Sequence, residues 1–388
     1  MANTFLTPDF VVNAAQDAAL ILSANLVASN LVSRQFEQLL AGGVPTVGPS
    51  GGSVDVKIIG ADTANTQNHR LTPGALTVSD VTETSVRVEA LHYVYVKKKL
   101  NTKEKTYELD NFSAKYTMPA MVGIANEIDS FMIRKIAGGF ARNISGTAGT
   151  AASSTAHILA CRKVLQDNLV PLAPRVAIIG TTSESSFLGL DHFVNRDYGE
   201  DGATALRQAA MSTRYGINWF VDQNVGTFSY GYTTGTILSN GALTSGTTAT
   251  VDGFTAATGT VNEGARFKIS GDTQEYVVTA DTDIVGNAAA LPVYPAIGTG
   301  WADGAAVTFQ TAHTEDVVFH PGMVAGAVIA PAALMSNSAV GGFDGLSIRV
   351  SFESTTSDST VGAADFVLYD VYVGAKVTRP EGGAVLQG

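Results

Sequence analysis

The sequence has little charge and almost no cysteine. Only 15% of its 388 residues are Asp, Glu, Lys or Arg, and one residue, Cys161, is cysteine. The charged fraction of an average soluble domain is about 25%. A single cysteine cannot form an intrachain disulfide, which excludes a disulfide-stabilised scaffold and suits a reducing compartment. Because a soluble monomer normally carries more surface charge, we expect partners to cover much of this surface.

Basic residues are scarce in the second half of the chain. Residues 1–221 hold 19 basic and 19 acidic side chains, residues 222–314 hold 2 and 8, and residues 315–388 hold 3 and 8. The abrupt change near residue 222 predicts a domain boundary. It also argues against a long basic face for duplex DNA, because neutralising phosphates requires clustered Lys and Arg. The sequence has one such cluster: Lys97, Lys98, Lys99, Lys103 and Lys105.

Long apolar runs are also missing. The stretch from Ala18 to Ala28 is interrupted by Ser23 and Asn25, and it is shorter than the ~20 residues that a membrane span requires. The first basic residue is Arg34, so no charged region precedes this stretch as in an export signal. We therefore expect neither a membrane segment nor export. With 45% apolar residues the chain can still bury a sizeable core, and its length predicts two or three structural units.

Motifs for catalysis and metal binding are absent or misplaced. The stretch 48–52 satisfies the G-x-S-x-G pattern around Ser50, but it lies in a loop before a strand, whereas a nucleophilic serine needs a sharp strand-to-helix turn. The six histidines are scattered, and Asp281 and Asp283 lack the other ligands of a calcium loop. We expect no catalytic residue, metal or cofactor. A hydrolase that uses Ser50 is the alternative, and it would lose its activity in Ser50→Ala.

The first hundred residues predict a helical arm and a projecting hairpin. Thr7, Pro8 and Asp9 have the order of a helix start, and an Ala- and Leu-rich stretch follows as far as Leu40. Apolar residues alternate near 54–58 and again over 86–96, with a long polar connection between the two runs. An isolated two-stranded hairpin is marginally stable. We therefore expect this one to lie on something else, such as another copy of the chain.

A long helix is predicted next. Thr117 is the expected N-cap, an apolar stripe runs from Met121 to Ile136, and Gly138 with Gly139 ends the helix. The remaining surface of this helix is assigned to Glu127, Asp129, Arg134 and Lys135.

An α/β pattern follows and is interrupted by a β-rich segment. Residues 222–314 are rich in Gly, Thr and Ala with short alternating runs, which predicts a small all-β barrel or sandwich inserted into the α/β domain. The elements expected on either side of it are a helix over 156–167, a strand over 176–179, helical stretches near 184–190 and 203–211, a strand over 217–221, a strand over 317–319, an Ala-rich helix to 335, and strands over 347–353 and 367–373.

The order of these elements resembles that of the major capsid proteins of tailed bacteriophages, whose fold is also found in herpesvirus shells. The resemblance is closest to coat proteins that carry an extra β-barrel. The matching parts are the hairpin over 54–96 as the extended loop, 117–136 as the spine helix, 222–314 as the insertion, 261–270 as a barrel strand entered through a turn, and 372–381 as the closing strand and turn.

The resemblance implies an α+β capsid fold with an inserted all-β barrel. The expected division of the chain is an N-terminal arm (1–53), an extended hairpin loop (54–100), a spine helix and peripheral region (101–154), the first part of an axial α/β domain (155–221), an inserted β-barrel domain (222–314), and the closing part of the axial and peripheral regions (315–388).

The resemblance also implies a structural, non-enzymatic function. Many copies would form the hexamers and pentamers of an icosahedral shell around double-stranded DNA, with a separate scaffolding protein and a portal protein, after assembly in the host cytoplasm. The acidic segments would then lie on the outer side, away from the packaged DNA. The alternative is a tail-tube, fibre or surface-layer subunit, which the Gly- and Thr-rich β segment would suit.

The lysine cluster has more than one interpretation. Lys97, Lys98, Lys99, Lys103 and Lys105 could protect an exposed strand from edge pairing. They could also meet an acidic surface of a neighbouring subunit or the phosphates of packaged DNA. We treat these lysines as a candidate intersubunit contact.

Overall fold

The computed structural model describes most of the chain, in the following ranges: 8–35, 53–59, 83–100, 112–140, 143–147, 149–150, 154–194, 211, 213–227, 231, 233–243, 245–298, 300–332, 337–355 and 364–388. Several predicted features lie outside these ranges. They are the helix start at Thr7, the motif around Ser50, the loop of the hairpin, Lys103, Lys105 and most of the helical stretch 203–211.

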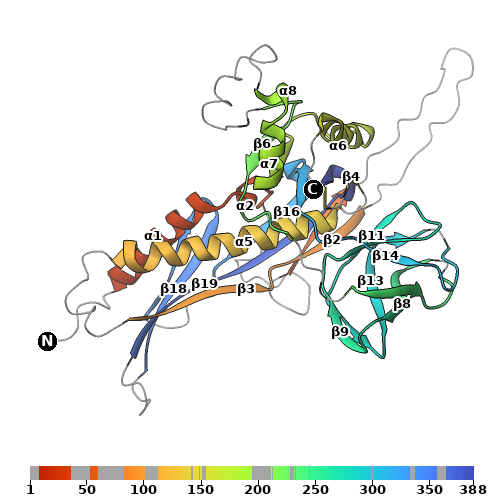
Figure 1. Cartoon of the computed structure of the whole chain (residues 1–388). Helices are drawn as coiled ribbons and strands as arrows, with labels where there is room; N and C mark the ends of the chain where they lie inside the picture. Colours follow the sequence, from red (N-terminus) through yellow and green to blue (C-terminus); the bar gives the residue numbers. More distant parts are fainter. Residues whose placement is uncertain are drawn as a thin grey trace, which may run out of the picture.

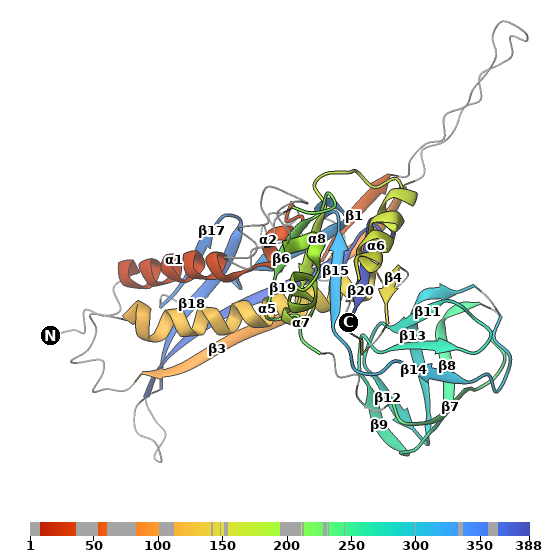
Figure 2. The ribbon, with the colours of Figure 1, turned by 45° about the horizontal axis from the view of Figure 1, so that its top comes forward.

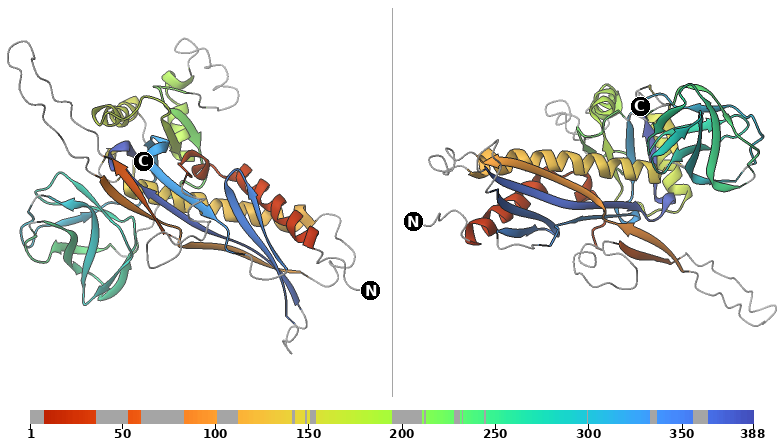
Figure 3. Two further views of the ribbon diagram at one scale, coloured as in Figure 1. Left: turned by 180° about the vertical axis from the view of Figure 1, so that it is seen from behind. Right: turned by 90° about the horizontal axis from the view of Figure 1, so that it is seen from below.

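An elongated antiparallel sheet forms the largest part of the molecule, and its central strand is β19 (Ala364–Val377). One edge of β19 pairs with β3, and the other pairs first with β18 and then with β16; β17 extends the sheet beyond β18. The strand bounds are His92–Leu100 for β3, Val324–Ile329 for β16, Ser338–Phe343 for β17 and Leu346–Thr355 for β18. Helices α1 (Pro8–Asn25) and α5 (Met118–Gly139) cover one face (Figures 1 and 3).

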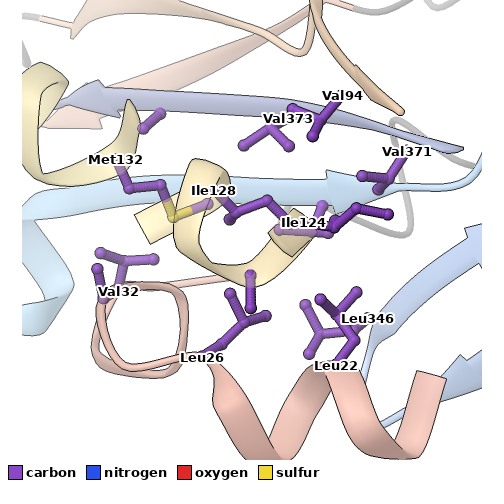
Figure 4. Close-up of a cluster of buried hydrophobic side chains, with 14 of the residues drawn as sticks. Leu22, Leu26, Val32, Val94, Ile124, Ile128, Met132, Leu346, Val371 and Val373 are labelled. Atoms are coloured by element: carbon purple, nitrogen blue, oxygen red, sulfur yellow. The ribbon is translucent and has the colours of Figure 1, made fainter. Parts of the chain in front are cut away.

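Helix α5 is the predicted spine helix, and its apolar stripe forms the main core. Ile124, Ile128 and Met132 are fully buried. They lie between Val371 and Val373 of β19 on one side and Leu22 of α1 and Leu26, which follows α1, on the other (Figure 4). The spacing of the stripe every three or four residues therefore produces one continuous buried face, as the sequence predicts.

Two details of α5 differ from the prediction. Thr117 is not an N-cap, because the π-helical turn η3 (Ser113–Thr117) continues the helix backwards, and its hydroxyl lies 3.0 Å from that of Tyr369. Asp129 is buried rather than on the surface. Its carboxylate accepts the backbone N–H groups of Val27 at 2.8 Å and Ala28 at 3.1 Å. It thereby fixes the turn between α1 and the short helix α2 (Ala28–Leu31).

A hairpin is present, but the return strand predicted over 86–96 is divided into two strands, and the base of the hairpin rests on the chain's own sheet. Strands β1 (Ser53–Ile59) and β2 (Glu83–Glu89) pair antiparallel. After β2 the chain bends, and β3 continues on β19 instead of on β1. Val56 and Val88 pack against Ala325 of β16. The side chain of Ala325 is only a methyl group, which lets the two valines of the hairpin approach the sheet closely.

The second sheet contains the predicted α/β elements. Its strand order is β4-β20-β15-β5-β6, with β4 parallel to β20 and β5 parallel to β6. The bounds are Ile144–Gly146 for β4, Val176–Ile179 for β5, Asn218–Val221 for β6, Glu315–Phe319 for β15, Gly383–Gln387 for β20, and Thr155–Asp167, Thr181–Leu188 and Asp191–Val194 for helices α6, α7 and α8. The sequence indicated β5, β6, β15 and α6 but not β4 or β20.

The β-rich segment forms an eight-stranded sheet with its own core, which we call the β module (235–309). Figure 2 shows it at one end of the molecule, close to β4 and β20. A bridge between Leu238 and Ala306 links β7 to the segment before β14, so the strands β14-β10-β11-β13-β8-β7 return on themselves. The strand bounds are Gly235–Ser239 for β7, Gly246–Phe254 for β8, Thr258–Val261 for β9, Arg266–Ile269 for β10, Glu275–Val278 for β11, Thr282–Val285 for β12, Ala288–Ile297 for β13 and Val307–Phe309 for β14.

The predicted Ala-rich helix ending at Met335 is wrong. Its first half is strand β16, in which all six residues are buried. A methyl group at Gly326 would lie 2.5 Å from Cγ2 of Val32, so the strand and the end of the arm approach each other closely. Only a small residue fits at Gly326, and helix propensity is overridden here by tertiary contacts.

A buried carboxyl group makes the stability of this fold depend on pH. Asp316 in β15 is fully buried, and its Oδ1 accepts the N–H of Gly180 at 2.7 Å. Burial raises the pKa of Asp316 to about 7, whereas an unfolded aspartate titrates near 3.9. Between about pH 4 and 7, Asp316 is therefore protonated in the folded protein and ionised in the unfolded chain. The free energy of unfolding decreases as the pH rises through this range.

We predict that Asp316→Asn raises the thermal midpoint at pH 8 relative to the unsubstituted protein, and that this gain shrinks at pH 5. The amide oxygen keeps the bond from Gly180 without a buried charge. The measurement is thermal unfolding at both pH values, with Asp17→Asn on the exposed side of α1 as the control. Equal effects of Asp316→Asn at the two pH values would contradict the assignment.

Candidate intersubunit surface

The face of the long sheet opposite α1 and α5 carries a mixed aromatic and charged surface, which we call the open sheet face. Side chains alternate along a strand, so the residues of β3 and β19 that do not pack on α5 point to this side. No helix of the described ranges covers this face. Its members are Tyr93, Tyr95, Lys97 and Lys99 of β3, Phe366, Leu368, Asp370 and Tyr372 of β19, and Arg349, Ser351 and Glu353 of β18.

Three tyrosines form a row at one end of this face. The ring centroids of Tyr93 and Tyr95 are 5.4 Å apart, and those of Tyr93 and Tyr372 are 5.2 Å apart across the ladder. Tyr95 is 58% exposed although it is a large side chain in a regular strand. Tyrosines that expose an apolar ring with a polar end are typical of protein interfaces.

A buried ion pair between Asp370 and Arg349 holds Tyr93 of this row in position. Asp370 is fully buried and is held by the Arg349 guanidinium, which donates from Nε at 3.0 Å and also from Nη2. The Tyr93 hydroxyl donates to the same carboxylate at 2.8 Å. Burial and this bond to Asp370 raise the pKa of Tyr93 to about 12. The ring of Tyr93 is therefore fixed in place and its hydroxyl stays protonated in neutral solution.

The lysine cluster is divided between the two faces of β3. Lys97 pairs with Glu353 on the open sheet face and lies 4.9 Å from the centroid of the Phe366 ring. Lys98 points to the helix side, where its Nζ donates to the carbonyl oxygen of Tyr116 at 3.1 Å and burial lowers its pKa. Lys99 is exposed on the open sheet face. Among the described strands, β3 pairs only with β19, so these lysines lie on an edge strand.

The sequence pointed to the lysines but not to the tyrosines or to Asp370. The alternation over 86–96 placed Tyr93 and Tyr95 on the face opposite the apolar residues, and this was the one sequence feature that indicated their exposure. The register between β3 and β19 joins residues 265 to 281 positions apart, from Leu100 with Asp365 to His92 with Val373. No local pattern contains that pairing, so the Tyr93–Asp370–Arg349 contact could not be predicted.

Among the described residues, no group of three or more His, Cys, Asp or Glu side chains is arranged to hold a metal ion. None of the helices in the described ranges is both long enough and apolar enough to span a membrane. Cys161 is buried in α6, and burial raises the pKa of its thiol to about 12.

Comparison with known proteins finds similarity only at the level of structure. No protein-family model and no curated protein sequence matches the chain. A solved structure from Mycobacterium phage Che8 matches with a TM-score of 0.51 and 14% identity, over 93% of this chain and 90% of that one. The capsid structure of the cyanophage P-SCSP1u has a TM-score of 0.45 and 14% identity over 87% and 83% of the two chains. The mature capsid of bacteriophage PhiM1 matches with a TM-score of 0.44 and 12% identity, over 87% of this chain and 82% of that one.

The match to the Che8 structure extends over nearly the whole of both chains, so the two proteins share a fold. This shared fold is α+β, as the order of elements in the sequence implied.

We predict that Arg349→Met destabilises the protein far more than Lys97→Met. The first substitution leaves the buried Asp370 carboxylate without its cation, which typically costs about 3 kcal/mol or more. The second removes an exposed pair, which is usually worth less than about 1 kcal/mol. Urea unfolding of the two variants measures the difference, and equal losses would show that the Asp370 pair does not support this face.

Proposed function

We propose that this protein is a major capsid protein, a non-enzymatic subunit that self-assembles into the icosahedral shell around a phage genome. The observation that carries the proposal is the fold shared with the Che8 structure over 93% of this chain and 90% of that one. The P-SCSP1u and PhiM1 structures are those of phage capsids. The sparse charge of the sequence supports the proposal, since a shell subunit covers much of its surface with its neighbours.

Assembly would rest on many weak contacts repeated between copies, arranged as hexamers and pentamers. We propose that the open sheet face and the edge of β3 take part in these contacts, with Lys97, Lys98, Lys99, Lys103 and Lys105 as the candidate intersubunit residues. Exposed Tyr95 and Lys99 support this, because they combine an aromatic anchor with a positive charge. Residues 222–388 carry an excess of 11 acidic side chains, from 16 acidic and 5 basic residues, which offers a neighbour's lysines a complementary surface.

We also propose the six-part division of the chain given by the sequence, with 222–314 as an inserted barrel domain. Its separate core and returning strand order support this division. The acidic charge of this domain favours the outer side of a shell, away from the phosphates of packaged DNA.

The remaining partners follow from the same proposal. A separate scaffolding protein and a portal protein would take part in assembly in the host cytoplasm, and the mature protein would reside in the virion. Double-stranded DNA would be enclosed without sequence-specific binding, because base reading requires side chains placed in a groove of the duplex.

The experiment that tests this function is electron microscopy and light scattering of the expressed protein, alone and with its candidate scaffolding protein. We expect closed, shell-sized particles. Tubes or two-dimensional sheets would instead favour a tail-tube or surface-layer subunit. A protein that stays monomeric under both conditions would contradict the proposal.

The open sheet face makes a sharper prediction about assembly. The double substitution Tyr95→Ala with Lys99→Glu should reduce particle yield about tenfold or more, while the thermal midpoint of the subunit changes little, because both side chains are exposed. The matched control is Lys163→Glu on α6, where the side chain is also exposed. Unchanged particle yield in the double variant would remove this face from the proposed contacts.

A further inference from the structure

The β module is joined to the rest of the protein by buried polar groups. Its core and the main core around α5 form two separate hydrophobic clusters, and among the described residues no apolar cluster extends across the junction. A groove of about 610 Å3 lies between the module, α5 and the base of the hairpin. Apolar packing alone therefore does not determine how the module is oriented.

Arg266 is the centre of this junction. Residues 222–314 contain only two basic side chains, Arg266 and Lys268, and Arg266 is completely buried. Its Nη2 donates to the carbonyl oxygen of Ala137 at 3.1 Å, and its Nε donates to Oε1 of Glu315. One guanidinium from the module thus contacts the last turn of α5 and the first residue of β15. A cation at this position also complements the negative end of the helix dipole.

Further polar contacts surround this pair. Nε2 of His313 lies 3.2 Å from Oε1 of Glu315. Gln387 of β20 donates to Oε1 of Glu275 in β11 at 3.1 Å, and Lys268 lies 3.4 Å from the same carboxylate group. The contact of Gln387 with Glu275 connects the module to the second sheet, and His313 lies in the segment between the module and β15. The pair of Lys268 with Glu275 lies within the module.

A separate ion pair connects the module to the side of α5. Lys135 of α5 pairs with Glu263, which precedes β10 in the module. Both side chains are about one third exposed, at 33% and 34%. This pair is therefore a weaker connection than the buried one at Arg266.

The positive charge of Arg266 keeps the buried Glu315 carboxyl ionised. Burial opposes ionisation of the Glu315 carboxyl, but Arg266 and His313 outweigh it and hold its pKa below the ordinary value. Removing one partner from such a buried pair leaves an uncompensated charge and is strongly destabilising. The same penalty discourages any rotation of the module that would separate Arg266 from Glu315.

We infer that Arg266 locks the β module to the spine helix and to the second sheet, so that the three parts form one rigid, cooperative body. Arg266 is a positioning residue in this inference, and the orientation of the module is the same in every copy of the chain. This inference concerns contacts within one subunit and does not depend on the proposed shell function.

The two tryptophans of the sequence provide the test, because they lie on opposite sides of the junction. Trp219 belongs to β6 of the second sheet, and Trp301 packs on Phe267 and Tyr276 in the module. The variants Trp301→Phe and Trp219→Phe each leave one fluorophore, which reports the unfolding of one side in the full chain. Urea unfolding is followed in both backgrounds, with the assembly state matched by light scattering.

With Arg266 present, we expect the two signals to have the same midpoint. Arg266→Met should separate the midpoints by about 1 M urea or more, and should increase the rate of limited proteolysis near residues 222–234 at least about tenfold. The control, Lys268→Met, removes the other basic residue of the module, which is half exposed, and should leave the midpoints coincident.

Three results would overturn the inference: separated midpoints with Arg266 in place, coincident midpoints in Arg266→Met, or equal effects of the two substitutions. If Arg266→Met does not fold, Arg266→Lys takes its place, because lysine keeps the charge but not the forked geometry that reaches both Ala137 and Glu315. Coincident midpoints in that variant, at the urea concentration found with Arg266, would also overturn the inference. None of these measurements depends on particle formation.

Discussion

The pairing of β19 with three other strands is the interaction on which the rest of the structure depends. This one strand of 14 residues holds β3 on one edge and β18 and β16 on the other. Its buried side presents Tyr369, Val371 and Val373 to α5, and its other side presents Asp370 and Tyr372 to the open sheet face. The core, the base of the hairpin and the candidate contact surface therefore share one backbone ladder.

Local patterns predicted most helices and strands because their apolar residues repeat with the expected period. The stripe from Met121 to Ile136 is an example and corresponds to a buried face. The alternation of 86–96 is divided between β2 and β3, and their buried residues Val88 and Val94 belong to different clusters. The helix predicted before Met335 is wrong, because the chain there forms strand β16, in which Gly326 lies too close to Val32 for a larger side chain. The contacts of Arg266 could not be predicted from its neighbours in the sequence, because its partners lie 49 and 129 residues away.

The distribution of charge in the sequence now has a structural explanation. Three of the five basic residues after 221 form the pairs described above: Arg266 at the junction, Lys268 within the β module, and Arg349 beneath the tyrosines. Some acidic residues of this half are buried, among them Asp316 and Asp370, and others pair with cations of the first half, as Glu263 does with Lys135 and Glu353 with Lys97. Sparse charge thus coincides with a small number of buried ion pairs, which contribute more to a single defined arrangement than to stability.

The bend between β2 and β3 has a mechanical consequence. The hairpin and β3 are one continuous stretch of chain, so a force on the hairpin pulls β3 along its own axis. The bonds between β3 and β19 run perpendicular to that axis, and the nine residue pairs of this ladder would be loaded together. A ladder whose bonds are loaded together in shear resists separation better than one whose bonds break one after another from its end. The attachment of the hairpin through β3 is therefore suited to bear tension.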